Sequence, residues 1–258
     1  MFNIPSMTSH RLQSISTQVA ARTLSGVMPY YVVTEFPKSG GTWLSQMLSE
    51  ALNIHHVRHQ FPPLKRALLH MHSIDGRGLK NVTVIWRDGR DVMISWYYHC
   101  LFEQNHFNAE LVASVRAQLG DRDYDNVYEH LPDFIEYAFT AARFPRFTWA
   151  DFVRYWHDKN GVLYTRYEDL LLHPADELIR LSAAHHQGSV LDRNAAVQIA
   201  EHYSFQNQSG RKAGNEQKHH FLRKGIVGDW KNNFSQQACE VFDFYAGEEM
   251  RLLGYQSC

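Results

Sequence analysis

The sequence has few of the features that mark a secreted or membrane-spanning protein. Its three cysteines, Cys100, Cys239 and Cys258, are widely spaced and form no Cys-x-x-Cys pair, which argues against a disulfide framework or a cysteine-based zinc site. No apolar run approaches the ~18 residues that a transmembrane helix needs, and the N-terminus lacks the apolar core of a secretory signal. We therefore expect a cytoplasmic protein without a membrane span.

An excess of charge of either sign is also missing. The chain has 26 Lys plus Arg against 27 Asp plus Glu, a formal net charge of −1. A protein without a global basic field has no general attraction for nucleic acid, so we expect no nucleic-acid partner. Any site for an anion must be local.

The chain contains no internal repeat, low-complexity tract or long linker, and its 258 residues suit one large domain. No acidic residue precedes Glu35, while Arg11 and Arg22 lie among many Ser and Thr residues. A transit peptide shares this composition, but two arginines are few for targeting. We expect residues 1–28 to form an extension with a short helix, roughly Arg11 to Leu24, and residues 29–258 to form the domain.

Strand and helix patterns alternate along the chain. In each unit a short apolar or β-branched run is followed by a turn and then by apolar residues at helical spacing. The three units are Tyr30–Phe36 with Thr42–Leu52, Val82–Trp86 with the helix after residues 88–90, and Val162–Tyr167 with Ala175–Ala184. This pattern predicts an α/β fold, a P-loop-like central parallel sheet with helices on both faces in a single domain, whose ligands bind at the carboxyl ends of the strands.

The first strand-to-helix turn, residues 36–43, reads Phe-Pro-Lys-Ser-Gly-Gly-Thr-Trp. Its glycine pair lets the backbone direct N–H groups toward one point at a helix N-terminus, while Lys38 adds a positive charge and Thr42 a hydroxyl. The pattern favours an anion cradle over an ordinary turn with an exposed lysine. Because the lysine precedes the glycines and no Gly-Lys-Ser/Thr follows, a kinase or ATPase is a weaker alternative.

Three motifs resemble those of the cytosolic-type sulfotransferases that use PAPS (3′-phosphoadenosine 5′-phosphosulfate). The loop at residues 37–43 is similar to the family's Pro-Lys-Ser-Gly-Thr-Thr-Trp, with Gly41 in place of threonine. Residues 86–95 resemble the segment in which an arginine and a serine, here Arg87 and Ser95, bind the 3′-phosphate. Residues 223–231 are similar to the C-terminal motif Arg-Lys-Gly-x-x-Gly-Asp-Trp-Lys.

The resemblance implies an enzyme of the EC 2.8.2 type that uses PAPS as donor and releases PAP. Trp43, Tyr167 and the Ser204-Phe205 pair would contact adenine, which suits aromatic faces, and guanidinium groups suit a dianionic phosphate. The implied donor-binding residues are Lys38, Ser39, Gly40, Gly41, Thr42, Trp43, Arg87, Ser95, Tyr167, Ser204, Phe205, Arg223, Lys224 and Gly225.

The resemblance also implies a catalytic Lys38 that stabilises the leaving phosphate, assisted by Ser95, and a histidine base. The family's Lys-Thr-His strand matches residues 70–72, which makes His72 the base and puts His70 at the lysine position. Because residues two apart on a strand share a face, His70 remains an alternative. The pair could bind a metal ion, but the sequence indicates no third ligand, so we expect no metal.

The expected acceptor is a small molecule with a hydroxyl or amine. Its pocket is predicted from Phe61–Leu69, Tyr97–Phe107 and Phe144–Trp156, although the helical spacing of Trp149, Phe152 and Trp156 favours core packing. The histidine pairs at 55–56, 185–186 and 219–220 are expected at the surface.

The oligomeric state and an inactive alternative are the remaining expectations. The family's dimer motif is altered here, with Ser235 and Gln236 between Lys231 and Glu240, which predicts a monomer or a weak homodimer. A PAP-binding scaffold without catalysis is the other alternative, but Lys38 and both histidines are retained.

Overall fold

The computed structural model describes residues 6–57, 61–104, 108–142, 144–186 and 191–258. The chain forms two compact units, each assembled from segments that are far apart in the sequence. The first unit comprises residues 1–35, 39–86 and 158–203, and the second comprises residues 36–38, 87–157 and 204–258.

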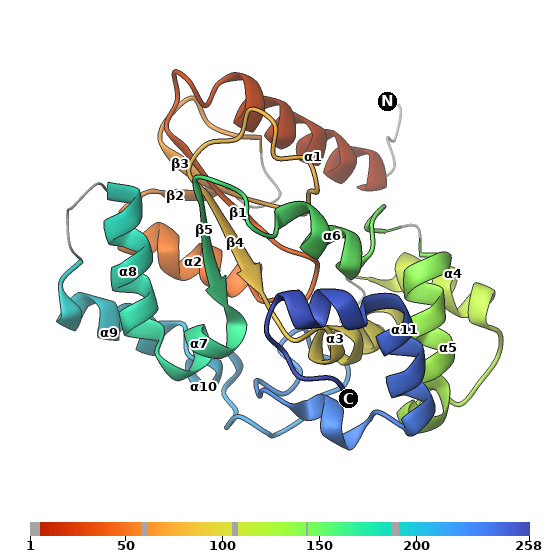
Figure 1. Ribbon diagram of the computed structural model, residues 1–258. Helices are drawn as coiled ribbons and strands as arrows, with labels where there is room; N and C mark the ends of the chain where they lie inside the picture. The colour runs from red at the N-terminus through yellow and green to blue at the C-terminus, as the bar shows by residue number, and fades with distance from the viewer. Residues whose placement is uncertain (1–5, 58–60, 105–107, 143, 187–190) are drawn as a thin grey trace. The chain divides into compact units, whose positions relative to one another are not determined.

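A five-stranded parallel sheet forms the centre of the first unit (Figure 1). Every residue of β1 and β4 is buried, as expected for central strands of a parallel sheet with both faces covered. All carboxyl ends of the strands lie at one edge, where Glu35 follows β1 and His72 follows β3. In sheet order the strands are β2 (His55–Val57), β3 (Ala67–Met71), β1 (Tyr30–Thr34), β4 (Val82–Trp86) and β5 (Val162–Arg166).

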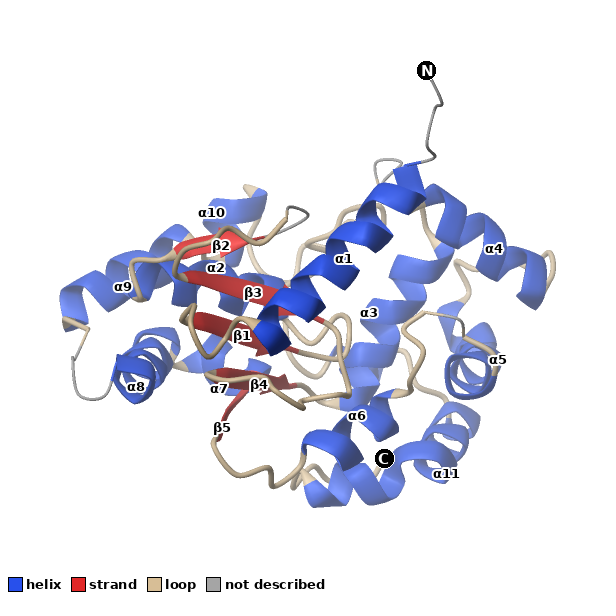
Figure 2. Ribbon diagram, turned by 90° about the horizontal axis from the view of Figure 1, so that it is seen from above, coloured by secondary structure: helices blue, strands red, loops and turns tan. Residues whose placement is uncertain are grey.

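Helices of the same unit cover both faces of the sheet. In Figure 2, α1 (Ser6–Thr23) crosses in front of the sheet over β3, and α2 (Gly41–Ala51) lies behind it. The helices α8 (Pro174–His186) and α9 (Arg193–His202) pack against α2. The buried core between α2, α8 and the strands includes Leu44, Leu48 and Leu178. The predicted central parallel sheet flanked by helices is confirmed.

The second unit is helical in the residues that the structure describes. Its longest helix, α11, packs against α3, α5 and α6. Trp149, Phe152 and Trp156 on α6 are buried, so the prediction of core packing for these side chains is confirmed. The helices are α3 (Gly89–Leu101), α4 (Ala109–Leu119), α5 (Val127–Thr140), α6 (Trp149–Trp156), α10 (Phe205–Ser209), the 3₁₀ helix η1 (Asp229–Asn232) and α11 (Gln236–Leu252).

Several predicted boundaries are corrected by the structure. The strand expected to end at Tyr167 ends at Arg166, and Tyr167 begins the short helix α7 (Tyr167–Leu172). Glu168 and Asp169 lie in the first turn of α7, where negative charge stabilises a helix N-terminus. The strand expected to reach Phe36 ends at Thr34. No helix within the described ranges is both long enough and apolar enough to cross a membrane.

The surface prediction for the histidine pairs is wrong for His185. Its Nε2 lies 2.8 Å from Thr83 Oγ1, and its ring packs edge-on against Tyr31 with centroids 5.2 Å apart. The hydroxyl of the buried strand residue Thr83 needs a polar partner, and the imidazole supplies one. His55 and His219 are exposed, as predicted.

Candidate functional site

The part of the predicted donor loop that belongs to the first unit requires glycine at position 40 for two reasons. Gly40 is the N-cap residue of α2 in the left-handed conformation, with φ of 100°. A Cβ at this position would lie 2.6 Å from Cδ2 of Tyr167. Ser39 beside it is buried. The tight turn at Gly40 leads directly into the N-terminus of α2. A helix N-terminus attracts anions through its N–H groups and dipole.

A buried carboxylate that sequence reasoning missed lies beside this loop. The Gly41 N–H donates a hydrogen bond to Glu35 Oε2 at 2.5 Å, and Glu35 Oε1 lies 3.1 Å from His70 Nε2. Burial opposes ionisation of Glu35, but the hydrogen bond to His70 and the charges of His70 and His72 outweigh it and lower the pKa of the carboxyl. Glu35 is thus a buried anion held by one backbone donor and a histidine.

Gly41, the residue that departs from the family's loop, provides the space for this pair. A Cβ on Gly41 would lie 2.5 Å from Glu35 Cδ and 2.8 Å from His70 Nε2. Neither distance is tolerated by real side chains without movement of the neighbouring atoms. The departures at positions 41 and 70 are therefore linked in space through Glu35, to which no sequence pattern around either position points.

The two candidate bases share one face of the sheet edge, as their spacing predicts. The ring centroids of His70 and His72 are 5.1 Å apart. His72 Nδ1 lies 3.2 Å from the backbone oxygen of Glu35, whereas His70 faces the carboxylate of the same residue. The choice of His72 over His70 as the base stays a prediction.

Two of the predicted adenine-binding side chains contact each other in the first unit. The rings of Trp43 and Tyr167 are 5.7 Å apart at an angle of 64°. Trp43 Nε1 donates to the backbone oxygen of Tyr203 at 2.9 Å, which fixes the orientation of the indole. Thr42, the remaining loop residue of the prediction, lies in the first turn of α2.

The predicted leaving-group lysine belongs to the second unit, where it contacts the predicted 3′-phosphate arginine. Arg87 Nη1 donates to the backbone oxygen of Lys38 at 3.0 Å. Lys38 has a φ of 76°, a conformation that is uncommon for residues other than glycine. The Lys38 Nζ lies 4.1 Å from the ring centroid of Phe221. Ser95 lies on α3, the helix that follows Arg87.

The remaining predicted nucleotide residues of this unit also pack on one another. The Ser204 hydroxyl caps α10 by accepting from the Asn207 N–H at 3.3 Å. Next to it, the ring of Phe205 covers Gly225, whose φ is 66°. The Arg223 guanidinium lies over the ring of Tyr98 at 4.5 Å. The C-terminal motif is thus joined to α3 and to the Ser204-Phe205 pair.

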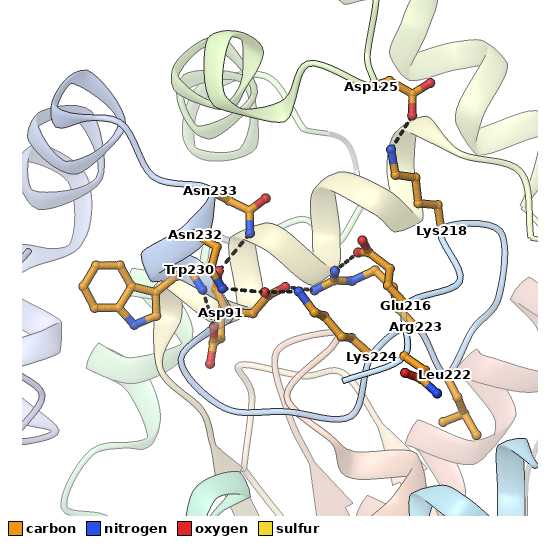
Figure 3. A network of polar contacts seen from close by, with 12 residues as sticks. Asp91, Asp125, Glu216, Lys218, Leu222, Arg223, Lys224, Trp230, Asn232 and Asn233 are labelled. Atoms are coloured by element: carbon orange, nitrogen blue, oxygen red, sulfur yellow. Dashed lines mark hydrogen bonds and ion pairs between the residues drawn. The ribbon is translucent and has the colours of Figure 1, made fainter. Parts of the chain in front are cut away.

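An ion-pair network holds the two basic residues of the C-terminal motif (Figure 3). Arg223 Nη2 and Lys224 Nζ each lie 2.6 Å from the carboxylate of Asp229, and Arg223 also pairs with Glu216. Burial disfavours the charged form of Asp229, but the hydrogen bonds from Lys224 and Arg223 prevail and lower its pKa. The side chains of both cations are therefore held in defined positions.

A second carboxylate fixes the backbone of the same motif. Asp91 on α3 accepts hydrogen bonds from the N–H groups of Gly228 at 2.7 Å and Trp230 at 2.9 Å. Because Asp91 is buried, these charge-assisted bonds are strong. They tie η1 to α3, the helix that carries Ser95.

The predicted site residues fall into two groups, one in each unit. Within each group the structure brings residues together that the sequence separates by up to about 130 positions, as for Gly40 with Tyr167 and Arg87 with Lys38. The first group is Ser39, Gly40, Gly41, Thr42, Trp43, His72 and Tyr167, and the second is Lys38, Arg87, Ser95, Ser204, Phe205, Arg223, Lys224 and Gly225.

Comparisons with known proteins agree with the motifs. A family model described as Sulfotransferase domain matches residues 70–254. Mouse Sulfotransferase 1B1 is 27% identical over 88% of this chain and 84% of that protein, and Cavia porcellus Sulfotransferase 1E1 is 27% identical over 65% of this chain and 53% of that protein. The crystal structure of mouse sulfotransferase SULT7A1 complexed with PAP has a TM-score of 0.63 at 19% identity, covering 86% of this chain and 84% of that chain.

The family model covers well over half of the chain, so the chain belongs to the sulfotransferase domain family and is a PAPS-dependent sulfotransferase. The structural likeness confirms the predicted single-domain α/β fold. The kinase alternative is set aside.

Proposed function

We propose that this sulfotransferase moves the sulfuryl group of PAPS to a hydroxyl or amine of a small-molecule acceptor by in-line displacement. The observation that carries the proposal is the hydrogen bond from Arg87 Nη1 to the backbone oxygen of Lys38. It joins the residue proposed to bind the 3′-phosphate to the residue proposed to act on the leaving group, so that donor binding and chemistry are coupled.

The chemistry of each group of residues suits a different part of the donor. In the first unit, the α2 N-terminus and Ser39 suit the 5′-phosphosulfate, and the rings of Trp43 and Tyr167 suit adenine. In the second unit, Arg87 and Arg223 offer the planar, always charged donors that best match a dianionic 3′-phosphate. Ser95, Lys224, Gly225 and the Ser204-Phe205 pair complete the proposed set.

Lys38 is the proposed electrostatic catalyst. Bound PAPS supplies the sulfuryl group. As the bond between sulfur and the bridging phosphate oxygen breaks, negative charge increases on that oxygen. An ammonium group aimed at that oxygen stabilises the transition state more than the ground state, as in phosphoryl transfer. Ser95 is proposed to bind the 3′-phosphate and to restrain Lys38 before the acceptor is in place.

His72 is the proposed general base. An imidazole with a pKa near ~6.5 can take the proton of an attacking hydroxyl or amine at neutral pH. If His72 donates Nδ1–H to the backbone oxygen of Glu35, at 3.2 Å, the lone pair on its other nitrogen, Nε2, receives the proton. His70 is the alternative base.

Donor binding is tested by thermal unfolding with PAP. A hundredfold excess over Kd stabilises a protein by about 2.7 kcal/mol, which for this size raises Tm by roughly 5–10 °C. We expect Arg87→Ala to abolish the shift, while Arg193→Ala, which removes an exposed guanidinium from α9, leaves it unchanged. An unaltered PAP-dependent shift in Tm of Arg87→Ala would show that Arg87 does not bind the 3′-phosphate.

The base is tested by transfer kinetics. We expect His72→Ala to lower kcat by about 10²-fold or more and to retain the PAP-dependent shift in Tm. His70→Ala serves as the comparison. Full activity of His72→Ala, together with loss of activity in His70→Ala, would assign the base to His70.

The N-terminal extension, residues 1–28, is proposed to be a separate element that packs on the domain at residues 29–258. Arg22 Nη2 donates to the backbone oxygen of Asp75 at 2.8 Å, and Ser25 Oγ donates to that of Gly78 at 3.0 Å. Deletion of residues 1–28 should leave PAP binding intact, and loss of folding would contradict the boundary.

Light scattering tests the proposed oligomeric state, a monomer or a weak homodimer.

The segments proposed to select the acceptor are Phe61–Leu69 in the first unit and Tyr97–Phe107 and Phe144–Trp156 in the second. Residues 105–107 lie outside the described residues. Phe61 and Phe144 are more than half exposed, and exposed aromatic rings of this kind can receive an apolar acceptor. Labelled PAPS with a panel of phenols, alcohols and amines identifies the acceptor class.

A further inference from the structure

Three side chains that commonly bind metal ions meet at the carboxyl ends of β1 and β3. Glu35, His70 and His72 each offer one ligand atom, and these atoms all lie within 4.8 Å of one another. The sequence indicates only the two histidines, because Glu35 comes from a different strand. The parallel pairing of β1 with β3 brings the third ligand alongside them.

The spacing of the first two ligand atoms suits a shared ion. Glu35 Oε1 lies 3.1 Å from His70 Nε2. Two ligands bound at about 2.1 Å to one tetrahedral ion lie roughly 3.4 Å apart. Two bonds to a metal would then replace the hydrogen bond between these two side chains.

The groups behind these ligands orient them as the outer partners of metal sites do. His72 Nδ1 lies 3.2 Å from the backbone oxygen of Glu35, and donation to a carbonyl fixes the tautomer whose Nε2 carries the lone pair. The second carboxylate oxygen of Glu35 accepts the Gly41 N–H at 2.5 Å. A ligating histidine and a ligating carboxylate are both usually held in this way.

The cluster coincides with the departures from the family's motifs. The family's lysine at position 70 carries an ammonium that is a donor without a lone pair at neutral pH, whereas His70 offers a neutral nitrogen ligand. The family's threonine at position 41 would place a Cβ 2.5 Å from Glu35 Cδ, so Gly41 gives the carboxylate its room. The side chains of Glu35 and His70 are 4% and 9% exposed, a setting in which an ion of opposite charge interacts strongly with the carboxylate.

We propose that Glu35, His70 and His72 bind a divalent transition metal ion of the zinc and cobalt class. Two imidazoles and one carboxylate are a known ligand set for such ions, and they leave at least one coordination position open. The proposal concerns metal binding alone and does not depend on which histidine is the base.

The proposal is tested by titrating the full-length, chelator-treated protein with Co²⁺ alone and recording visible absorption, followed by displacement with Zn²⁺. We expect one tightly bound equivalent with the intense bands of a four- or five-coordinate ion. Glu35→Gln and His70→Ala should each weaken binding by at least about tenfold. His55→Ala, which removes an exposed histidine from β2, is the matched control. It tests whether loss of any one of the chain's 16 histidines weakens Co²⁺ binding.

The overturning results are distinct from failure of the proposed function. The proposal is overturned if the protein binds no tight equivalent of Co²⁺, or if Glu35→Gln and His70→Ala bind Co²⁺ as tightly as the wild type. Glu35 and His70 would then form only a hydrogen bond with each other. Because Glu35→Gln preserves the shape of the side chain, it remains informative if His70→Ala does not fold, and retention of the PAP-dependent shift in Tm verifies folding of each variant. Metal binding is read without transfer activity, so a negative result leaves the proposed sulfuryl transfer in place.

Discussion

The ring of Phe205 occupies the space that a side chain at position 225 would need. A Cβ on Gly225 would lie 2.4 Å from Cδ2 of Phe205, and Gly225 has a φ of 66°. The glycine of the C-terminal motif therefore lets the backbone lie directly against a ring that is proposed to contact adenine. Motif and ring thus depend on each other for their positions.

Substitution Gly225→Ala tests this dependence. A left-handed conformation costs an alanine about 1–2 kcal/mol, and the new methyl group must also displace Phe205. We expect lower stability and a smaller PAP-dependent shift in Tm. Gly210→Ala is the matched control, because Gly210 has a similar φ of 69° with nothing within 4 Å of its Cβ position. An equal loss of PAP binding in both variants would contradict a specific role of the contact.

Asp229→Asn should destabilise the second unit. Asp229 is 2% exposed and accepts from both Arg223 and Lys224, so the substitution removes the charge and replaces one of the two acceptor oxygens by a donor NH2 group. We expect a loss of about 1–3 kcal/mol in the free energy of unfolding measured in urea. Asp125→Asn, which breaks the exposed pair with Lys218, should cost less than about 1 kcal/mol. Similar losses in the two variants would show that burial of Asp229 adds nothing.

The same carboxylate gives stability a defined dependence on pH. The pKa of Asp229 lies below its ordinary value of 3.8 in the folded protein. The ionised carboxylate therefore stabilises the fold above the unfolded pKa, and this stabilisation is lost as the pH falls through the lower, folded pKa. We expect the difference in stability between wild type and Asp229→Asn to be constant above about pH 5 and to shrink below about pH 4. A difference in stability that grows as the pH falls would contradict a lowered pKa of Asp229 in the folded protein.

Gly41→Ala should be destabilising in the presence of Glu35 and less so in its absence. The added methyl group would lie 2.5 Å from Glu35 Cδ, and overpacking of this kind costs about 1–3 kcal/mol. In a cycle of Gly41→Ala, Glu35→Ala and the double variant, we expect a coupling energy of about 0.5–3 kcal/mol by urea unfolding. Additive effects would show that the loop moves away from Glu35 without cost.

Zinc should inhibit transfer without being required for it. Binding of an ion at Glu35, His70 and His72 uses the imidazole lone pairs, so neither histidine can accept the acceptor's proton. We expect chelator-treated enzyme to be active, added Zn²⁺ to lower kcat, and chelator to restore it. Glu35→Gln should need a higher zinc concentration for the same inhibition, whereas His55→Ala should not. Activity that appears only with metal would instead make the ion part of the catalytic machinery.

Local patterns were sufficient to predict β1, β4 and β5 and the helices α1, α2, α3 and α8. The buried runs Tyr31–Val33 and Val82–Trp86 are strands because adjacent β-branched and aromatic residues are stable with both faces covered. Gly40 and Gly41 are visible as a turn, and the motifs at Arg87 and Arg223 identify the family. The short helix α7 was not predicted, because its single turn carries too little periodicity.

The sequence by itself determined the family, the parallel sheet and the residues proposed for the donor, since each depends on contiguous segments whose backbone conformation is locally encoded. Only the tertiary structure revealed the buried carboxylate beside the two candidate bases. Glu35 and His70 are separated by 34 intervening positions, and their 3.1 Å contact arises because parallel pairing aligns the carboxyl ends of β1 and β3. Register between distant strands is set by packing of the whole sheet, and no local pattern around either residue encodes it.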